Sequence, residues 1–142
     1  MNVQQQIKSY IEEQKEPKRS DMQILHEQIL QLLPENKLWF LDGKDHTGKV
    51  VSNPNIGYGQ FTLHYKDGSS KEFYQIGISG NTSGISVYIM GLEDKNYLPN
   101  TFGSVIGKAT VTGYCIKFKV LKDIDISILK QAIRYGIKIT GK

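Results

Sequence analysis

The stretch from Gly57 to Gly91 constrains the fold of this chain more than any other segment. Apolar and polar residues alternate within it three times, over residues 61–65, 74–78 and 85–89. The alternating runs are separated by segments 66–70 and 79–84, which contain Asp-Gly and Gly-Asn pairs. Alternation with a period of two, interrupted by such turn residues, is typical of antiparallel strands joined by hairpins. The segment therefore predicts a three-stranded meander.

Helical patterns precede the predicted sheet. An amphipathic helix is predicted within residues 1–16. Its apolar residues lie at positions i, i+4, i+7 and i+8, which are Val3, Ile7, Tyr10 and Ile11. A second helix is predicted to begin at Ser20, as the N-cap of a capping box with Gln23, and to stop at 34–36. A short apolar run over 38–41 then begins the sheet.

The remaining segments are predicted from similar signals. Residues 42–55 form either a long loop or a small hairpin, and Pro99 and Gly103 keep any helix in 93–106 short or irregular. A last strand is expected over 114–120. A closing helix follows it, capped by Asp123 or Asp125.

This order of elements predicts an α+β fold. We expect a single antiparallel sheet of four to six strands, with the N-terminal and C-terminal helices packed on one face. A chain of 142 residues fits one domain. It divides into an N-terminal helix in residues 1–16 and a core domain over 20–138.

Composition limits the class of protein. No run approaches 18 apolar residues and the N-terminus is polar and periodic, so neither a membrane partner nor a secretory signal is predicted. The single Cys115 has no partner for an internal disulfide. These features favour a cytoplasmic location.

Charge is distributed unevenly along the chain. Residues 1–46 hold six Lys or Arg against eight Asp or Glu, whereas residues 47–142 hold twelve against six. Such asymmetry can indicate an anionic partner. However, the basic residues from 117 onward form no Arg cluster and are not interleaved with exposed aromatic residues. Weak nucleic-acid binding through this basic C-terminal part is therefore an alternative and not the leading interpretation.

Chemistry-bearing residues are sparse. Cys115 lies in the middle of a predicted strand, without a following helix N-terminus to activate it, so no catalytic residue is assigned. Potential metal ligands crowd at one place, the loop that contains Asp42, Asp45 and His46. An Asx turn explains the same residues, and the spacing does not fit a calcium loop.

Several short segments, taken together, resemble one known family. They are Leu38-Trp39, Gly57-Tyr58-Gly59, His64-Tyr65, Gly77-Ile78-Ser79, Tyr88-Ile89-Met90, Gly107-Lys108 and Gly113-Tyr114-Cys115-Ile116, followed by Leu121–Asp125. In this order, over residues 20–136, they resemble the YdhG-like family, a bacterial domain of unknown function. The resemblance implies a frataxin-like arrangement, in which helices from both ends of the chain cover one face of a sheet.

The resemblance also suggests where a ligand could bind. The polar and aromatic residues of the shared segments predict a site on the polar sheet face and its rim, formed by Trp39, Tyr58, His64, Lys108 and Cys115. The leading hypothesis is a non-enzymatic binding or accessory domain without a cofactor, which recognises a small molecule or a protein.

The resemblance provides an alternative function as well. One branch of the family has been proposed as an intracellular iron chaperone. The corresponding hypothesis here is iron or other divalent-metal handling by Asp42, Asp45 and His46. Asp21, His26 or Glu27 on the second predicted helix would contribute.

Overall fold

The described part of the chain adopts an α+β fold with two sheets and four α-helices. The structure is a computed structural model that describes residues 2–33 and 37–141. The elements run in the order α1 (Val3–Glu12), α2 (Lys18–Leu32), β1 (Leu38–Leu41), β2 (Asn55–Tyr58), β3 (Phe61–His64), β4 (Ser70–Phe73), β5 (Ile76–Asn81), β6 (Gly84–Ile89), α3 (Tyr97–Phe102), β7 (Thr110–Val111), β8 (Cys115–Phe118), a 3-10 turn (Leu121–Asp123) and α4 (Ile126–Thr140).

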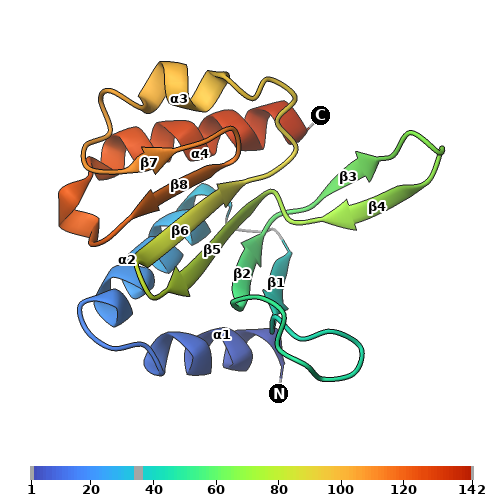
Figure 1. Ribbon diagram of the computed structural model, residues 1–142, viewed down its shortest axis with the longest axis horizontal. Helices are drawn as coiled ribbons and strands as arrows, with labels where there is room; N and C mark the ends of the chain where they lie inside the picture. The colour runs from blue at the N-terminus through green and yellow to red at the C-terminus, as the bar shows by residue number, and fades with distance from the viewer. Residues whose placement is uncertain (1, 34–36, 142) are drawn as a thin grey trace.

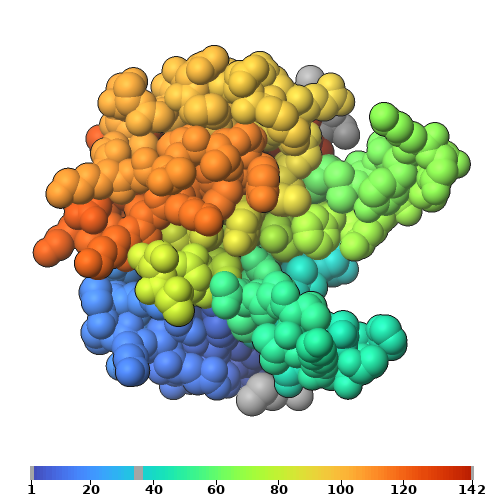
Figure 2. Space-filling model, in the orientation of Figure 1, coloured from blue at the N-terminus to red at the C-terminus, as the bar shows by residue number. Residues whose placement is uncertain are grey.

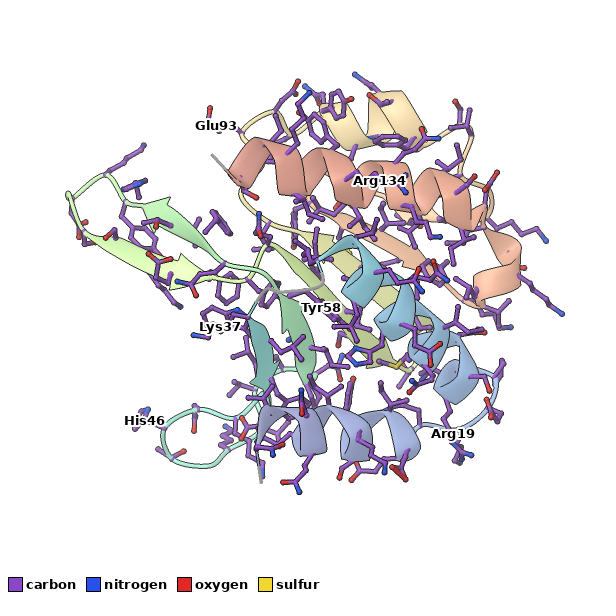
Figure 3. All side chains as sticks on the ribbon, turned by 180° about the vertical axis from the view of Figure 1, so that it is seen from behind. Arg19, Lys37, His46, Tyr58, Glu93 and Arg134 are labelled. Atoms are coloured by element: carbon purple, nitrogen blue, oxygen red, sulfur yellow. The ribbon has the colours of Figure 1, made fainter. Side chains whose placement is uncertain are left out.

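The main sheet has six antiparallel strands in the order β1-β2-β5-β6-β8-β7. Helices α2 and α4 lie on one side of it, behind the sheet in Figure 1 and in front of it in Figure 3. Helix α1 runs along the lower end of the sheet in both views, and it contacts β1 and α2 and adds Ile7, Tyr10 and Ile11 to the hydrophobic core. Helix α3 packs beside α4 and β7. The predicted α+β class, the strand number and the placement of the terminal helices on one face are confirmed.

The predicted meander is only partly correct. Strands β5 and β6 pair as expected, but β3 pairs with β4 and forms a separate two-stranded sheet. The run at 74–78 is therefore not the neighbour of the run at 61–65. The positive φ of +79° at Gly59 redirects the chain after β2. The β3–β4 hairpin consequently projects from the main sheet (Figure 1), and it stands out from the rest of the surface in Figure 2.

The helix boundaries follow local capping chemistry. Asn2 caps α1 in a capping box with Gln5. The predicted capping box at Ser20 is wrong, because α2 begins at Lys18. The backbone N–H and the hydroxyl of Ser20 instead donate to the Glu16 carboxylate, at 3.0 and 2.8 Å.

Other predicted boundaries have mixed outcomes. Of the two predicted caps for the closing helix, Asp125 is the one used, since it accepts from the backbone N–H of Ser127 at 2.9 Å. The predicted short helix within 93–106 is α3. The predicted stop of the second helix at 34–36 lies outside the described residues.

The core lies between the helices and the face of the sheet that they cover. We call this face the covered face. Its fully buried strand residues are Ile56, Tyr58, Ile76, Ile78, Ile85, Val87, Ile89 and Ile116. Helices α2 and α4 supply Met22, Leu25, Ile29, Leu129, Ala132 and Ile133 to the same cluster. Burying these side chains is the main stabilising contribution of the sheet.

Candidate functional site

The second face of the six-stranded sheet points away from the helices, and we call it the open face. The strand register places Trp39, Gly57, Gly77, Tyr88 and Cys115 in one row across it. These residues alternate with those of the covered face, so they point in the opposite direction. The open face is the one turned toward the viewer in Figure 1.

An aromatic cluster covers the part of the open face near β1, β2 and β5. The Tyr74 ring lies over Gly57 and Gly77, where any Cβ atom would approach its ring atoms to 2.5–2.6 Å. Phe73 stacks on Tyr74 with a centroid distance of 4.2 Å, and Trp39 meets Phe73 edge-on at 6.0 Å. Burial raises the pKa of Tyr74, which keeps its hydroxyl protonated. This part of the face is therefore closed by the protein's own side chains.

The other part of the open face, over β6, β8 and β7, carries a depression with a volume of about 680 Å³. Three exposed lysines, Lys108, Lys117 and Lys119, line it. The other lining residues are Asn53, Asn81, Thr82, Ser83, Ile85, Ser86, Tyr88, Ala109, Thr110 and Phe118. Of these described lining residues, none carries a carboxylate or an imidazole. The depression therefore combines positive charge with hydroxyl and amide groups.

Strand register explains why the lysines gather there. Lys117 on β8 lies between Ser86 on β6 and Thr110 on β7, and all three belong to the same cross-strand row. Lys119 directly follows the last residue of β8, and Lys108 lies two residues before β7. Lys108 thus lies beside the edge strand β7 and Lys119 beyond the end of β8, and both are exposed.

Hydrogen bonds fix the polar wall formed by the β5–β6 turn. The Asn81 amide donates to the Ser86 hydroxyl at 3.0 Å and accepts from the backbone N–H of Ser83 at 2.9 Å. The buried Ser79 hydroxyl donates to the carbonyl of Pro54 at 2.7 Å and holds the preceding loop against β5. The wall is therefore ordered without a ligand.

Cys115 and Tyr88 lie side by side at the edge of this depression. Cys115 is a buried free thiol, and burial raises its pKa. Burial and the neighbouring Cys115 also raise the pKa of Tyr88. Both groups are neutral near pH 7, so the geometry gives no activated nucleophile at this position.

The five predicted site residues do not line one concavity. Lys108 lines the depression and Cys115 lies beside it, whereas Trp39 belongs to the aromatic cluster. His64 is exposed on the β3–β4 hairpin, in a separate hollow that includes Thr62. Placing these residues together on the polar face was therefore wrong for His64.

The placement of Tyr58 on the polar face was also wrong. Its side chain lies on the covered face, between the sheet and α2, as Figure 3 shows. Its hydroxyl is 2.7 Å from Nδ1 of His26. Tyr58 is in phase with Ile56 on β2, so strand alternation alone predicts that it points into the core. Tyr88, Lys117 and Lys119, which sequence analysis missed, could have been found from the same alternation in β6 and β8.

The suggested metal ligands are engaged in local turns. Oδ1 of Asp45 accepts from the Thr47 backbone and hydroxyl and from the Lys49 backbone, at 2.9, 2.6 and 3.1 Å. Asp42 accepts from the backbone N–H of Lys44 at 3.0 Å. His46 lies on the same loop, far from Tyr58 in Figure 3. Of the two predicted alternatives for residues 42–55, a long loop or a small hairpin, the structure forms the hairpin, with one β-bridge between Lys44 and Val50.

The three suggested metal ligands on α2, namely Asp21, His26 and Glu27, also contact different parts of the protein. Asp21 accepts from the backbone N–H of Leu121 at 3.0 Å, His26 contacts Tyr58, and Glu27 accepts from Gln23 at 3.0 Å. Within the described part of the chain, no three His, Cys, Asp or Glu side chains gather into a group that could hold a metal ion. Metal handling through these residues stays a prediction without a built site.

The fold and the open face together define a small α+β domain with a preformed polar depression. No family model matches this chain, and neither a curated protein nor a solved structure gives a match. Among the helices of residues 2–33 and 37–141, none combines the length and apolar character needed to cross a bilayer.

Proposed function

We propose that this chain is a binding domain that takes a small anionic ligand, carrying phosphate or carboxylate groups, in the depression on the open face. One observation carries the proposal. Lys108, Lys117 and Lys119 converge on a concave, hydrogen-bonding surface whose described lining has no carboxylate to neutralise them. Three like charges held around one hollow repel one another, and an anion placed between them relieves that repulsion.

The size and lining of the depression support a small ligand. Its volume of about 680 Å³ falls within the usual range of small-molecule sites. The hydroxyl groups of Thr82, Ser83 and Thr110 add neutral donors that can fix the orientation of an anion. Binding rather than catalysis is favoured because the described lining holds no His, Asp or Glu side chain, and the pKa of its one phenol, Tyr88, is raised away from neutral pH.

The exposure of the lysines sets the expected strength and salt dependence. All three ammonium groups are solvent-exposed, so each contact is screened by water and salt. We expect affinity in the millimolar to high micromolar range for a simple anion. That affinity should fall clearly between 20 and 200 mM salt, because the Debye length shortens over this interval.

The test is a titration with pyrophosphate followed by amide chemical shifts at low salt. We expect saturable shifts confined to the β5–β6 turn, β7 and β8, and their loss in the triple variant Lys108→Gln/Lys117→Gln/Lys119→Gln. The matched control is Lys44→Gln/Lys49→Gln/Lys66→Gln, which removes the same charge from exposed positions elsewhere. Shifts lost equally in both variants, or not saturable, would overturn the proposal.

We also propose that the chain belongs to the YdhG-like family and acts in the cytoplasm. The order of the shared segments over 20–136 supports the family, and helices on one face of an antiparallel sheet agree with the arrangement expected for it. The free thiol of Cys115 supports a reducing compartment. Cell fractionation tests the location. Recovery of the protein mainly outside the cytoplasmic fraction would contradict the proposal that it acts in the cytoplasm.

A further inference from the structure

A pair of tyrosines borders the lysine-lined depression. Tyr88 is one of its lining residues and is half-buried on β6. Tyr114, just before β8, lies nearly parallel to Tyr88, with an interplanar angle of 16° and a centroid distance of 6.3 Å. Tyr114 is 48% exposed. The two side chains thus present aromatic surface to solvent directly beside the positive charge.

The register fixes the spatial relation between the tyrosines and the lysines. Tyr88 pairs with Cys115 and Ser86 pairs with Lys117, so Tyr88 and Lys117 are diagonal neighbours on the same face of the sheet. Diagonal partners on adjacent strands lie within reach of aromatic and long side chains. An aromatic ring resting on the tyrosine pair would therefore place a substituent of the same molecule among the lysines.

This arrangement was not apparent along the chain, because Tyr88, Lys108 and the β8 segment with Tyr114, Lys117 and Lys119 are three separate segments. Lys108 and Lys119 lie 20 and 31 residues after Tyr88 along the chain. They come together because β6 and β8 are adjacent strands and β7 pairs with β8. The interleaving of basic and aromatic side chains that was absent from the linear sequence is thus present on the folded surface.

We infer that the ligand of the depression is an aromatic phosphate of the nucleotide type, with its ring on Tyr88 and Tyr114 and its phosphates among Lys108, Lys117 and Lys119. This inference rests on the proposed anion-binding function and specifies its ligand class. Tyrosine rings stack on nucleobases without demanding a particular base, and lysine recognises phosphate as a point charge.

The geometry favours a mononucleotide over a nucleic-acid strand. The depression is a single hollow of about 680 Å³, and the aromatic cluster of Trp39, Phe73 and Tyr74 closes the adjacent part of the face. Strand-binding surfaces usually combine a continuous basic groove with several successive stacking platforms. Here one aromatic pair meets one cluster of lysines.

The experiment compares ADP with pyrophosphate, which carries the same number of phosphates without the nucleoside. Both are titrated at low salt and followed by amide chemical shifts. We expect ADP to bind about tenfold more tightly than pyrophosphate or better, since base–aromatic stacking has roughly that effect or more. The variant Tyr114→Ala should reduce ADP affinity to the level of pyrophosphate and leave pyrophosphate binding unchanged.

Tyr65→Ala is the matched control, because Tyr65 is exposed to a similar degree, 49%, on the β3–β4 hairpin. It should change neither titration. Equal affinities for ADP and pyrophosphate would overturn the inference and leave the anion-binding proposal intact, whereas absence of both would overturn the two together. Binding of an oligothymidylate much more tightly than ADP, at the same residues, would also overturn it in favour of a strand-binding surface.

Discussion

The two faces of the six-stranded sheet are formed by the same strands, but they differ in the types of side chain that they carry and in what covers them. On the covered face, Ile78 and Val87 pair across β5 and β6 and are fully buried beneath the helices. On the open face, the same two strands carry Gly77 opposite Tyr88. The covered face is filled by apolar volume, and the open face is shaped by glycine, aromatic and polar side chains. Because successive side chains of a strand point to opposite faces, one half of them stabilises the core and the other half forms the surface where a ligand could bind.

The open face is itself divided. Its β1-β2-β5 part is closed by Tyr74, whose ring occupies the space above Gly57 and Gly77. Its β6-β8-β7 part keeps the depression bordered by lysines. Substitutions on the two faces can test this division, and the expected changes in stability differ in size between them.

The largest effect is expected on the covered face. Ile78→Ala removes a fully buried side chain from the centre of β5, and the resulting loss of contacts and cavity should cost about 2–5 kcal/mol. Urea unfolding followed by circular dichroism measures this change. Val50→Ala is the control, because Val50 is 66% exposed on the 42–54 loop and should change stability by less than about 0.5 kcal/mol. Similar values for the two variants would contradict the division of roles.

A smaller effect is expected where Tyr74 covers the open face. In Gly77→Ala, the new Cβ would lie 2.6 Å from Cε1 of Tyr74 and force the ring to move. Overpacking of this kind should cost about 1–3 kcal/mol. The cost should shrink when Tyr74→Leu is also present, which a double-mutant cycle of unfolding free energies measures. Additive effects of the two substitutions would show that the ring does not restrict Gly77.

The smallest expected effect is a pH dependence of stability that arises from His26 on α2, which contacts Tyr58 on the covered face. Burial lowers the pKa of His26 below 6.5, and the neighbouring Glu27 partly opposes this shift. Nδ1 of the neutral imidazole lies 2.7 Å from the Tyr58 hydroxyl, which stays protonated because burial raises the pKa of Tyr58; in the Nε2–H tautomer Nδ1 accepts a hydrogen bond from it.

The sign of the effect follows from proton uptake. Just below pH 6.5 the unfolded chain binds a proton at His26 that the folded chain does not, so stability falls as pH drops through this window. Unfolding measured at pH 7.5 and 5.5 should show a smaller loss in His26→Gln than in the wild type. His64→Gln, at an exposed position on the hairpin, should retain the full loss. Identical pH dependence in the wild type and His26→Gln would refute this role.

Much of the fold could be predicted because it depends on local patterns. Alternation over 85–89 and 114–120 identified β6 and β8, and the apolar spacing of the terminal segments identified α1 and α4. The β3–β4 hairpin was misread, since one strand was predicted at 74–78, whereas β4 ends at Phe73 and β5 begins at Ile76. Where a chain bends out of a sheet depends on packing that local periodicity does not contain.

The site was less predictable than the fold. Lys108 was identified from a shared segment, but its partners Lys117 and Lys119 were seen only as solvated strand positions. Tyr58 was assigned to the wrong face, although its phase relative to Ile56 was available in the sequence. A site made by neighbouring strands requires the strand order, which residue spacing does not specify.

The sequence by itself determined the class of fold, the presence of the helices α1 and α4, and the alternation that gives strands such as β6 and β8 an apolar and a polar side. These properties arise from interactions between residues close along the chain and from the need to bury one face. The tertiary structure alone decided that β6 pairs with β8 and that β8 pairs with β7. That pairing brings Tyr88, Tyr114 and three lysines together at one place, because contacts across a sheet join residues distant in sequence.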